Sequence, residues 1–495
     1  MTVTQGDWAA TLRRLALPAE PEPWSLLDTG STLGGEGTAE VLGFPVTADL
    51  DDSAWEDIER AATDRLADGG YVVLRRPGDG DRPWASGEVI APWLGRFERL
   101  LRAGFTIHRG AAGCVSIRRA RTGVLYLAPW LTFGGSDVGT IDWLRHLPSG
   151  EFRRYLHTTQ PSENQLFAAA EALADEAWCL PDLMPGASMA QFVLGFIATR
   201  NVDVVHIMNS RLGFDLLPAM KSAFPHLRTV VQLHVEEEDR SGYCRYVTTR
   251  YGNLVDGFSL TSEDLRGKVR RYQMSPSKLH VIYTGLDPDR FDPGPSAGAH
   301  TRRATGSPGL DVLFPARLTA QKDPLLMVRV AASLRDAGSA SVIHVVGDGE
   351  LRGDVESAIA AAGLEDRVRL HGPSHDMLPW YRQTDVTLLT SRFEGLPFVI
   401  FESMGMARPV VVPDLGGSHE VVDASVGYVV RRRDLVDEYV AALLELERDP
   451  ELREAKGAAG RRRIIDRFTV DQMAGAHARL YRRLAAEYAV AGLFA

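Results

Sequence analysis

The chain of 495 residues is too long for one domain and fits about three domains of ordinary size. Hydrophobic residues make up 45% and charged residues 24%, the balance of a globular protein with a full core. With 55 Lys and Arg against 65 Asp and Glu, the formal charge of -10 argues against a dedicated nucleic-acid binder. No run approaches the ~18 to 20 apolar residues of a membrane span, so only peripheral membrane association stays open.

The cysteines and the start of the chain bear on its compartment. Cys114, Cys179 and Cys244 lie far apart and are odd in number, which fits neither a disulfide framework nor a zinc site. The first residues lack a basic cap followed by an apolar block, the pattern of a secretory signal. These features predict a cytoplasmic protein. The basic clusters at 431–433 and 461–463 are interpreted as solvated loop or helix faces, with a phosphate or membrane patch as the alternative.

Residues 1–120 form an N-terminal extension. It contains LLDTGSTLGGEGT (26–38), ADGGYVVLRRP (67–77) and ERLLRAGFTIHR (98–109). These stretches faintly resemble class I methyltransferases, but the glycine turn is imperfect and too few residues separate the parts for a complete cofactor domain. The resemblance implies a shortened, non-catalytic remnant that serves acceptor binding or assembly. An unrelated α/β module is the alternative, and no methyl transfer is expected.

Residues 121–290 alternate short apolar runs with segments of helical length. The runs at 124–130, 203–209, 229–235 and 278–285 predict buried strands. Strands that alternate with helices favour a parallel, doubly wound sheet.

A second domain of the same kind is predicted after a break. Residues 291–309 are rich in Pro, Gly, Ser and Ala and are interpreted as a linker. From 310 to 468 the strand candidates are DVLFPA, SVIHVVG, RVRLHG, DVTLLTS and ARPVVVPD. Residues 469–495 have helical periodicity and are expected to pack back toward the first domain. Two such α/β domains predict a ligand cleft at the carboxyl edges of both sheets.

Two cations fall in the loop after the predicted strand at 312–316. Arg317 and Lys322 stand five residues apart, where their heads are expected to converge over the cleft. Fixed cations at a sheet's carboxyl edge suit a diphosphate, whose charge grows as a bond to it breaks. Two loop cations without a binding role are the alternative.

A pair of glutamates, Glu394 and Glu402, follows the predicted strand at 385–391. Pro397 is expected at the first position of a helix, with backbone N–H groups near Gly395 pointing into the cleft as an anion site. The glycine permits close approach of a ligand. The two carboxylates would then accept hydrogen bonds from two sets of hydroxyls. A surface turn residue and a partly exposed helix residue are the alternative.

Taken together, these motifs resemble the retaining GT-B glycosyltransferases of family 4. The matching stretches are LYLAPWLTFGG (125–135), VIYTGLDPDRF (281–291), Arg317-x4-Lys322, VVGDGELR (345–352), RVRLHGPSHDMLPWYRQTDV (367–386), SRFEGLPFVIFE (391–402) and ARPVVVPDLGGSHEVV (407–422). One departure is Thr284, which replaces the family's usual asparagine. The resemblance spans about residues 123 to 490 and implies two doubly wound Rossmann-like domains facing across a cleft.

The resemblance also implies roles for single residues. Arg317 and Lys322 would hold the pyrophosphate of a nucleotide-diphosphate sugar. Glu394 would contact hydroxyls of the donor sugar, and Glu402 would contact the ribose. His234 matches a histidine near the transferred sugar, although a core histidine is the alternative. The remaining donor-binding positions are the flexible loop at Gly134 and Gly135 and the turn at Gly395, Leu396 and Pro397.

The reaction that the resemblance implies is sugar transfer to a hydroxyl acceptor with retention of anomeric configuration, assisted by the departing phosphate. No cofactor is expected, and DLD (49–51) and DPD (287–289) are interpreted as chance matches to a metal-binding D-x-D pattern. A catalytically silent sugar-nucleotide-binding subunit and a GT-B epimerase or phosphorylase are the alternatives. The donor sugar, its base and the acceptor stay open; the acceptor classes are glycan, lipid-linked, metabolite and protein.

Overall fold

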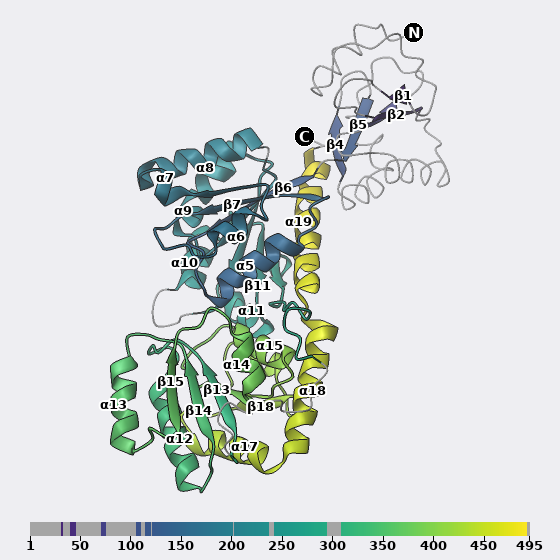
Figure 1. Ribbon diagram of the computed structural model, residues 1–495. Helices are drawn as coiled ribbons and strands as arrows, with labels where there is room; N and C mark the ends of the chain where they lie inside the picture. The colour runs from purple at the N-terminus through teal and green to yellow at the C-terminus, as the bar shows by residue number, and fades with distance from the viewer. Residues whose placement is uncertain are drawn as a thin grey trace, which may run out of the picture.

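The computed structural model describes residues 31–32, 40–45, 71–75, 105–109, 114–119, 121–200, 202–236, 242–294 and 308–492. Within these residues the chain forms two α/β domains, each built on a parallel sheet (Figure 1). The expected doubly wound, two-domain α/β architecture is therefore confirmed. None of the helices in the described part combines the length and the apolar composition that a membrane crossing needs.

The sheet of the first domain has seven parallel strands. In spatial order they are β12 (Leu279–Val281), β11 (Gly257–Leu260), β10 (Arg228–Leu233), β9 (Val204–Met208), β6 (Thr122–Ala128), β7 (Phe152–Thr158) and β8 (Glu176–Cys179). The chain enters at β6, proceeds to β8 and returns to β9 on the other side of β6. Strand order therefore reverses between β6 and β9, the position at which such sheets bind ligands.

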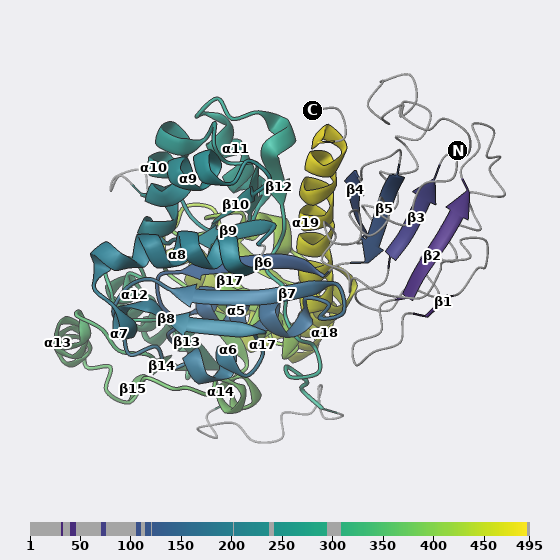
Figure 2. The same cartoon turned by 90° about the horizontal axis from the view of Figure 1, so that it is seen from above.

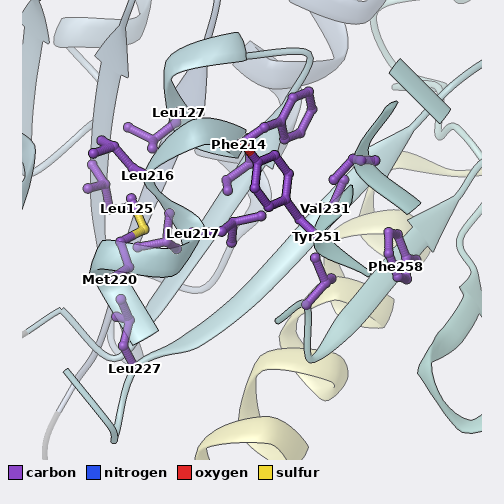
Figure 3. Close-up of a cluster of buried hydrophobic side chains, with 14 of the residues drawn as sticks. Leu125, Leu127, Phe214, Leu216, Leu217, Met220, Leu227, Val231, Tyr251 and Phe258 are labelled. Carbon is purple, nitrogen blue, oxygen red and sulfur yellow. The ribbon is translucent and has the colours of Figure 1, made fainter. Parts of the chain in front are cut away.

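Helices cover both faces of this sheet. They are α5 (Gly135–His146), α6 (Phe167–Glu171), α7 (Leu180–Leu183), α8 (Gly186–Arg200), α9 (Arg211–Ala223), α10 (Tyr243–Tyr251) and α11 (Glu263–Arg270), with a 3₁₀ turn η2 (Pro276–Lys278). Successive β6 side chains alternate between the two faces. Leu125 and Leu127 pack with Phe214 and Leu217 of α9, whereas Tyr126 joins the core on the opposite face. Figure 3 shows the side chains of α9 gathered against the strands.

Local sequence explains where α9 begins and which face it buries. The Ser210 hydroxyl accepts a hydrogen bond from the Gly213 backbone N–H at 3.1 Å, which caps the helix. Buried Phe214, Leu217 and Met220 then recur at three-residue spacing and form one apolar stripe.

The sheet of the second domain has six parallel strands. In spatial order they are β15 (Val368–Gly372), β14 (Val342–Val346), β13 (Asp311–Pro315), β16 (Val386–Leu388), β17 (Val410–Pro413) and β18 (Gly427–Val430). Its helices are α12 (Pro324–Asp336), α13 (Arg352–Ala362), α14 (Leu378–Gln383), α15 (Phe398–Gly405), α16 (Ser418–Val421), α17 (Val436–Arg448) and α18 (Pro450–Arg467). Strand order reverses between β13 and β16, so this sheet also has a ligand-binding switch point.

The last helix, α19 (Val470–Gly492), returns from the second domain to the first. Figures 1 and 2 both place it along one side of the first domain. Its Tyr481 is fully buried, accepts a hydrogen bond from Trp143 Nε1 at 3.0 Å and lies 2.5 Å from His206 Nδ1. His146 Nδ1 lies 2.7 Å from the Asp471 carboxylate. The end of the chain therefore belongs to the core of the first domain.

The N-terminal extension contributes a separate mixed sheet in the order β1-β2-β3-β5-β4. The strands are β1 (Ser31–Thr32), β2 (Glu40–Pro45), β3 (Tyr71–Arg75), β4 (Phe105–Arg109) and β5 (Cys114–Arg119). Only the β2–β3 pair is parallel among the pairs described here. Most of the glycine-rich stretch at 26–38 and most of the linker at 291–309 lie outside the described residues, and the methyltransferase-like remnant stays a hypothesis.

Candidate functional site

A cavity of about 370 Å³ lies where the switch points of the two sheets face each other. The first domain lines it with the start of α5 and with the ends of β9 and β10. The second domain lines it with the loops that follow β13 and β16. The volume falls at the low end of the ~300–1,000 Å³ of small-molecule sites. The cleft predicted from two doubly wound sheets is therefore present.

Lys322 and Glu394 form an ion pair at this cavity. The Glu394 side chain is 8% exposed and that of Lys322 is 18% exposed. The Ser391 hydroxyl also donates to Glu394 Oε1 at 2.6 Å. A buried carboxylate with two donors keeps its charge at low cost. The pair joins loops 72 residues apart and fixes both charges on the cavity wall.

The loop that carries Lys322 is held against the neighbouring strand. Asp323 adopts a left-handed backbone conformation with φ 47°, which turns the chain into α12. The Thr390 hydroxyl lies 3.1 Å from the Lys322 carbonyl oxygen and 2.9 Å from the Asp323 carbonyl oxygen. Arg392 and Arg433 both bind the Asp323 carboxylate at 3.1 Å. These contacts hold the loop in place, so the position of the Lys322 ammonium does not depend on a bound ligand.

Arg317 occupies a different position from Lys322. Its side chain is exposed and lies outside the cavity lining. No carboxylate lies within ion-pair distance of it in the described part of the chain. The two cations therefore do not converge on the same cavity wall in this conformation, contrary to the expectation from their spacing.

Glycines at 135 and 395 let the two domains touch. A Cβ atom on Gly395 would lie 2.0 Å from the carbonyl oxygen of His234, on the opposite domain. A Cβ atom on Gly135 would lie 2.8 Å from Phe398 Cβ. No real Cβ tolerates such distances, so only glycine fits at either position. The sequence had suggested room for a ligand at Gly395, whereas here the glycine makes room for the other domain.

Two helices begin at this contact, α5 after Gly134 and α15 after Pro397. Pro397 is the N-cap of α15 and Phe398 is its first residue, one position later than expected. Leu396 and Pro397 line the cavity, as does Gly135, whereas Gly134 lies just outside its lining. Helix N-termini carry partial positive charge and favour anions. The contact therefore brings two anion-favouring backbone ends together.

Glu402 lies on α15 away from the cavity lining. Its Oε2 accepts a hydrogen bond from the hydroxyl of buried Tyr381 at 2.8 Å. Burial raises the pKa of Glu402 to about 7, with smaller effects from Tyr381, Arg290 and Asp142. The structure thus separates the two glutamates of the predicted pair, with Glu394 at the cavity and Glu402 outside its lining.

His234 lines the cavity, and it belongs to a group of buried histidines. Burial lowers the pKa of His234 to about 4, and it does the same for His477 of α19. The Nε2 atom of His234 is buried and has no hydrogen-bond partner among the described residues. His206 lies behind them, with its ring 5.4 Å from that of His477. At neutral pH these imidazoles are uncharged and can exchange hydrogen bonds only as neutral groups.

Sequence reasoning missed several residues of the cavity wall. They are Tyr126, Ser136, Trp143, Asn209, Gln232, Ile282, Met473 and His477. Only Asn209 carried a usable signal, because asparagine at the end of a strand and before a helix cap tolerates a positive φ. Its φ is 50°. Such strained positions are concentrated at functional sites.

A polar contact links the domains beside the cavity. Glu420 accepts hydrogen bonds from the backbone N–H groups of Glu263 and Asp264, at 2.9 and 2.7 Å, at the start of α11. The Tyr283 hydroxyl donates to the same carboxylate at 2.6 Å. A carboxylate of the second domain thereby caps a helix of the first.

The residues described do not assemble a metal site. No group of three or more His, Cys, Asp or Glu side chains among them has the arrangement of metal ligands. In the DPD stretch, Asp287 Oδ1 accepts the backbone N–H groups of Asp289 and Arg290. That carboxylate therefore closes a local turn, whereas the DLD stretch lies outside the described residues.

Comparison with known proteins identifies similar chains. Residues 309–449 match the family model for glycosyl transferases group 1, and residues 133–290 match that for Glycosyltransferase Family 4. The alpha-D-kanosaminyltransferase of Streptomyces kanamyceticus is 33% identical over 207 residues, 39% of this chain and 52% of the relative. The D-inositol 3-phosphate glycosyltransferase of Thermomonospora curvata is 28% identical over 357 residues, 67% of this chain and 79% of the relative.

The chain spans about half the length of the first curated relatives it matches. Among solved structures, HepE of Anabaena in complex with UDP superposes with a TM-score of 0.61 at 18% identity, over 72% of this chain and 99% of HepE. At 18% identity, this similarity shows only that the chain and HepE share a fold.

Proposed function

Because the chain belongs to the family 4 glycosyltransferases of the GT-B fold, we propose that it transfers a sugar from a nucleotide-diphosphate sugar to a hydroxyl acceptor. The observation that supports this best is the cavity between the domains. There the Lys322–Glu394 pair faces an uncharged wall, beside two helix N-termini. A leaving diphosphate needs the cation and the helix ends, whereas sugar hydroxyls need the carboxylate and the neutral polar groups.

The donor is a nucleoside diphosphate sugar in this proposal. Lys322 stabilises the departing diphosphate, and Arg317 joins it from outside the cavity lining when the ligand is bound. Glu394 accepts hydrogen bonds from the donor sugar, and Glu402 contacts the ribose. HepE, a protein of the same fold, was solved with UDP, so UDP-sugars are the first donors to test.

We propose retention of the anomeric configuration. The bond between the anomeric carbon and the diphosphate oxygen breaks, the acceptor oxygen bonds to that carbon on the same face, and the acceptor's proton passes to the departing phosphate. Glu394, the carboxylate among the described lining residues, is already paired with Lys322, which supports a mechanism without a covalent glycosyl-enzyme. Neutral His234 offers a hydrogen bond beside the reacting centre.

The acceptor is expected to be rich in hydroxyl groups. The Thermomonospora curvata relative is named for D-inositol 3-phosphate, a ring polyol that carries one phosphate ester. We further propose that residues 1–120 serve acceptor binding or assembly.

The test is incubation of the purified full chain with UDP-, GDP-, TDP- and ADP-sugars, with and without cell extract, while nucleotide release is measured. We expect release with one donor class, and its loss in Lys322→Ala and Glu394→Ala. Release that these substitutions leave unchanged would disprove the site assignment. Tight nucleotide-sugar binding without release would favour a silent subunit, and isomerised donor sugar would indicate an epimerase.

A further inference from the structure

The two walls of the cavity differ in charge. Among the described lining residues, the charged side chains are Lys322 and Glu394, which belong to the second domain and pair with each other. The first domain contributes aromatic, apolar and neutral polar side chains to the same cavity. A ligand group that enters against the first domain therefore meets no unpaired ion from the lining.

The histidines on this wall do not change its charge. His234 and His477 both line the cavity, and burial lowers the pKa of each to about 4. His477 is also engaged with the Ser259 hydroxyl at 3.1 Å and with the Met473 carbonyl at 3.2 Å. Both imidazoles are therefore neutral at physiological pH.

Neutral hydrogen-bonding groups remain available on this wall. The Asn209 amide and the Thr284 hydroxyl line the cavity, and neither makes a hydrogen bond to the rest of the described chain. His234 Nε2 is likewise without a partner in the described residues. His234 Nε2 is a buried polar atom, and such an atom requires a ligand or water as its hydrogen-bond partner, whereas Asn209 and Thr284 are half-buried groups that a ligand can reach. Hydroxyl groups can both donate to and accept from such groups.

The nearest arginine along the chain is already engaged. Arg211 follows Asn209 by two residues, binds Asp215 at 2.9 Å and stacks on the ring of Tyr246 at 4.0 Å. It lies outside the cavity lining. Among the described lining residues the one Lys or Arg, Lys322, is already paired with Glu394, so a phosphate ester on the acceptor would meet only the partial positive charge of the helix N-termini there, which makes its burial costly.

We propose that the acceptor is an uncharged, ring-sized polyol or terminal sugar residue, and that the first-domain wall rejects phosphorylated acceptors. This inference depends on the proposed glycosyltransferase function. The cavity volume of about 370 Å³ favours a single ring beside the donor sugar over a longer segment of the acceptor.

The experiment compares pairs of acceptors that differ by one phosphate: myo-inositol with D-inositol 3-phosphate, and glucose with glucose 6-phosphate. The full chain is supplied with the donor it turns over, and nucleotide release and glycosylated product are measured. We expect kcat/KM for the neutral member of each pair to be at least about tenfold higher than for the phosphorylated member. This factor corresponds to the loss of one charge-assisted hydrogen bond to the phosphate. A phosphorylated member that is used equally or better would overturn the inference.

Two outcomes separate this inference from the proposed function. If neither member of a pair is glycosylated, the phosphate esters should still fail to inhibit hydrolysis of the donor. Inhibition by the esters that exceeds inhibition by the neutral compounds would then overturn the inference. If no nucleotide-sugar is bound or cleaved at all, the proposed function itself fails.

A matched pair of variants tests the charge of the wall directly. Asn209→Lys adds a cation where the neutral amide stands, and Asn209→Met adds similar length without charge. Both lose the asparagine that tolerates φ 50°, so their stabilities should be alike. We expect the lysine variant to favour the phosphorylated acceptor about tenfold more than the methionine variant does. Equal preferences in the two variants would show that this wall does not select against charge.

Discussion

The second-domain wall of the cavity carries charged side chains, whereas the first-domain wall carries neutral ones. The second-domain wall carries a preformed ion pair, Lys322 and Glu394, anchored by short loops. The first-domain wall buries His234 and His477 as neutral groups beside aromatic rings. In the proposed reaction the diphosphate would therefore leave beside the charged second-domain wall, and the acceptor hydroxyl would attack from the side of the neutral first-domain wall. The comparison suggests that donor affinity and acceptor selection are properties of different domains.

The largest effect is expected from removing the charge of the second-domain wall. Lys322→Met should lower kcat about 10²–10³-fold, because in the proposed mechanism it removes the group that stabilises charge on the leaving phosphate. It should also lower the melting temperature, since Glu394 would be left buried without its cation. The measurements are single-donor kinetics and thermal unfolding.

A double variant distinguishes these two consequences. Lys322→Met with Glu394→Gln removes both charges and should regain much of the lost stability while staying inactive. Recovery of activity in the double variant would mean that the pair is structural only.

The next effect comes from separating the walls. Gly395→Ala places a Cβ atom 2.0 Å from the His234 carbonyl oxygen, so the domains must move apart at the reacting centre. We expect a loss of about 10²-fold in kcat/KM, the cost of a displacement of about 1 Å.

Gly353→Ala is the control for this substitution, because its added Cβ meets nothing within 4 Å. Gly353 lies in α13, where alanine should add about 0.5–1 kcal/mol of stability and leave the kinetics unchanged. Equal kinetics in the two alanine variants would mean that the domain contact is dispensable.

A smaller effect concerns the pH dependence of the second domain. Burial raises the pKa of Glu402 from 4.5 in its ordinary state to about 7, so folding favours its protonated form. The resulting stability is fully present below pH 4.5, is lost as pH rises to about 7 and stays lost above that. Glu402→Gln should therefore be more stable relative to wild type at pH 8 than at pH 5, by about 1.4 kcal/mol for each pH unit between pH 5 and the raised pKa.

Thermal unfolding at both pH values checks this prediction. Exposed Glu365→Gln in the same domain is the matched control. A Glu402→Gln advantage that is identical at pH 5 and pH 8 would contradict the raised pKa.

The smallest effect is expected at the polar contact between the domains. Glu420→Ala leaves the Ser262 cap of α11 in place but removes the acceptor of two further backbone N–H groups and of the Tyr283 hydroxyl, which should cost about 1–2 kcal/mol of unfolding free energy. Tyr283→Phe removes one of the three hydrogen bonds and should cost less. Chemical denaturation measures both, and a larger loss for Tyr283→Phe would contradict the capping role of Glu420.

The second-domain wall was predictable because its charged residues lie in loops that follow neighbouring strands. Lys322 lies in the loop after β13 and Glu394 in the loop after β16, so strand assignment alone brought them to one sheet edge. The divergent positions of Arg317 and Glu402 were not predictable, because a side chain's direction depends on packing around the loop or helix. The contact between Gly395 and His234 also requires knowledge of how the domains approach each other.

The first-domain wall was largely hidden from sequence reasoning. Met473 and His477 reach it from α19, more than 300 residues after β6. Several strands also escaped the pattern search. β7 reads FRRYLHT and β8 reads EAWC, which are short or interrupted by charges, because these strands lie toward one edge of the sheet.

The return of α19 to the first domain couples the order of synthesis to the order of folding. Val470, Tyr481 and Leu484 complete the core that also contains Val124 and Tyr126. A ribosome finishes these residues only after the whole second domain has been made. The first domain thus emerges early with an open apolar face, while the second can close its own core. Of the two α/β domains, the one that is made first is completed last, and chaperone binding to nascent chains should be concentrated on it.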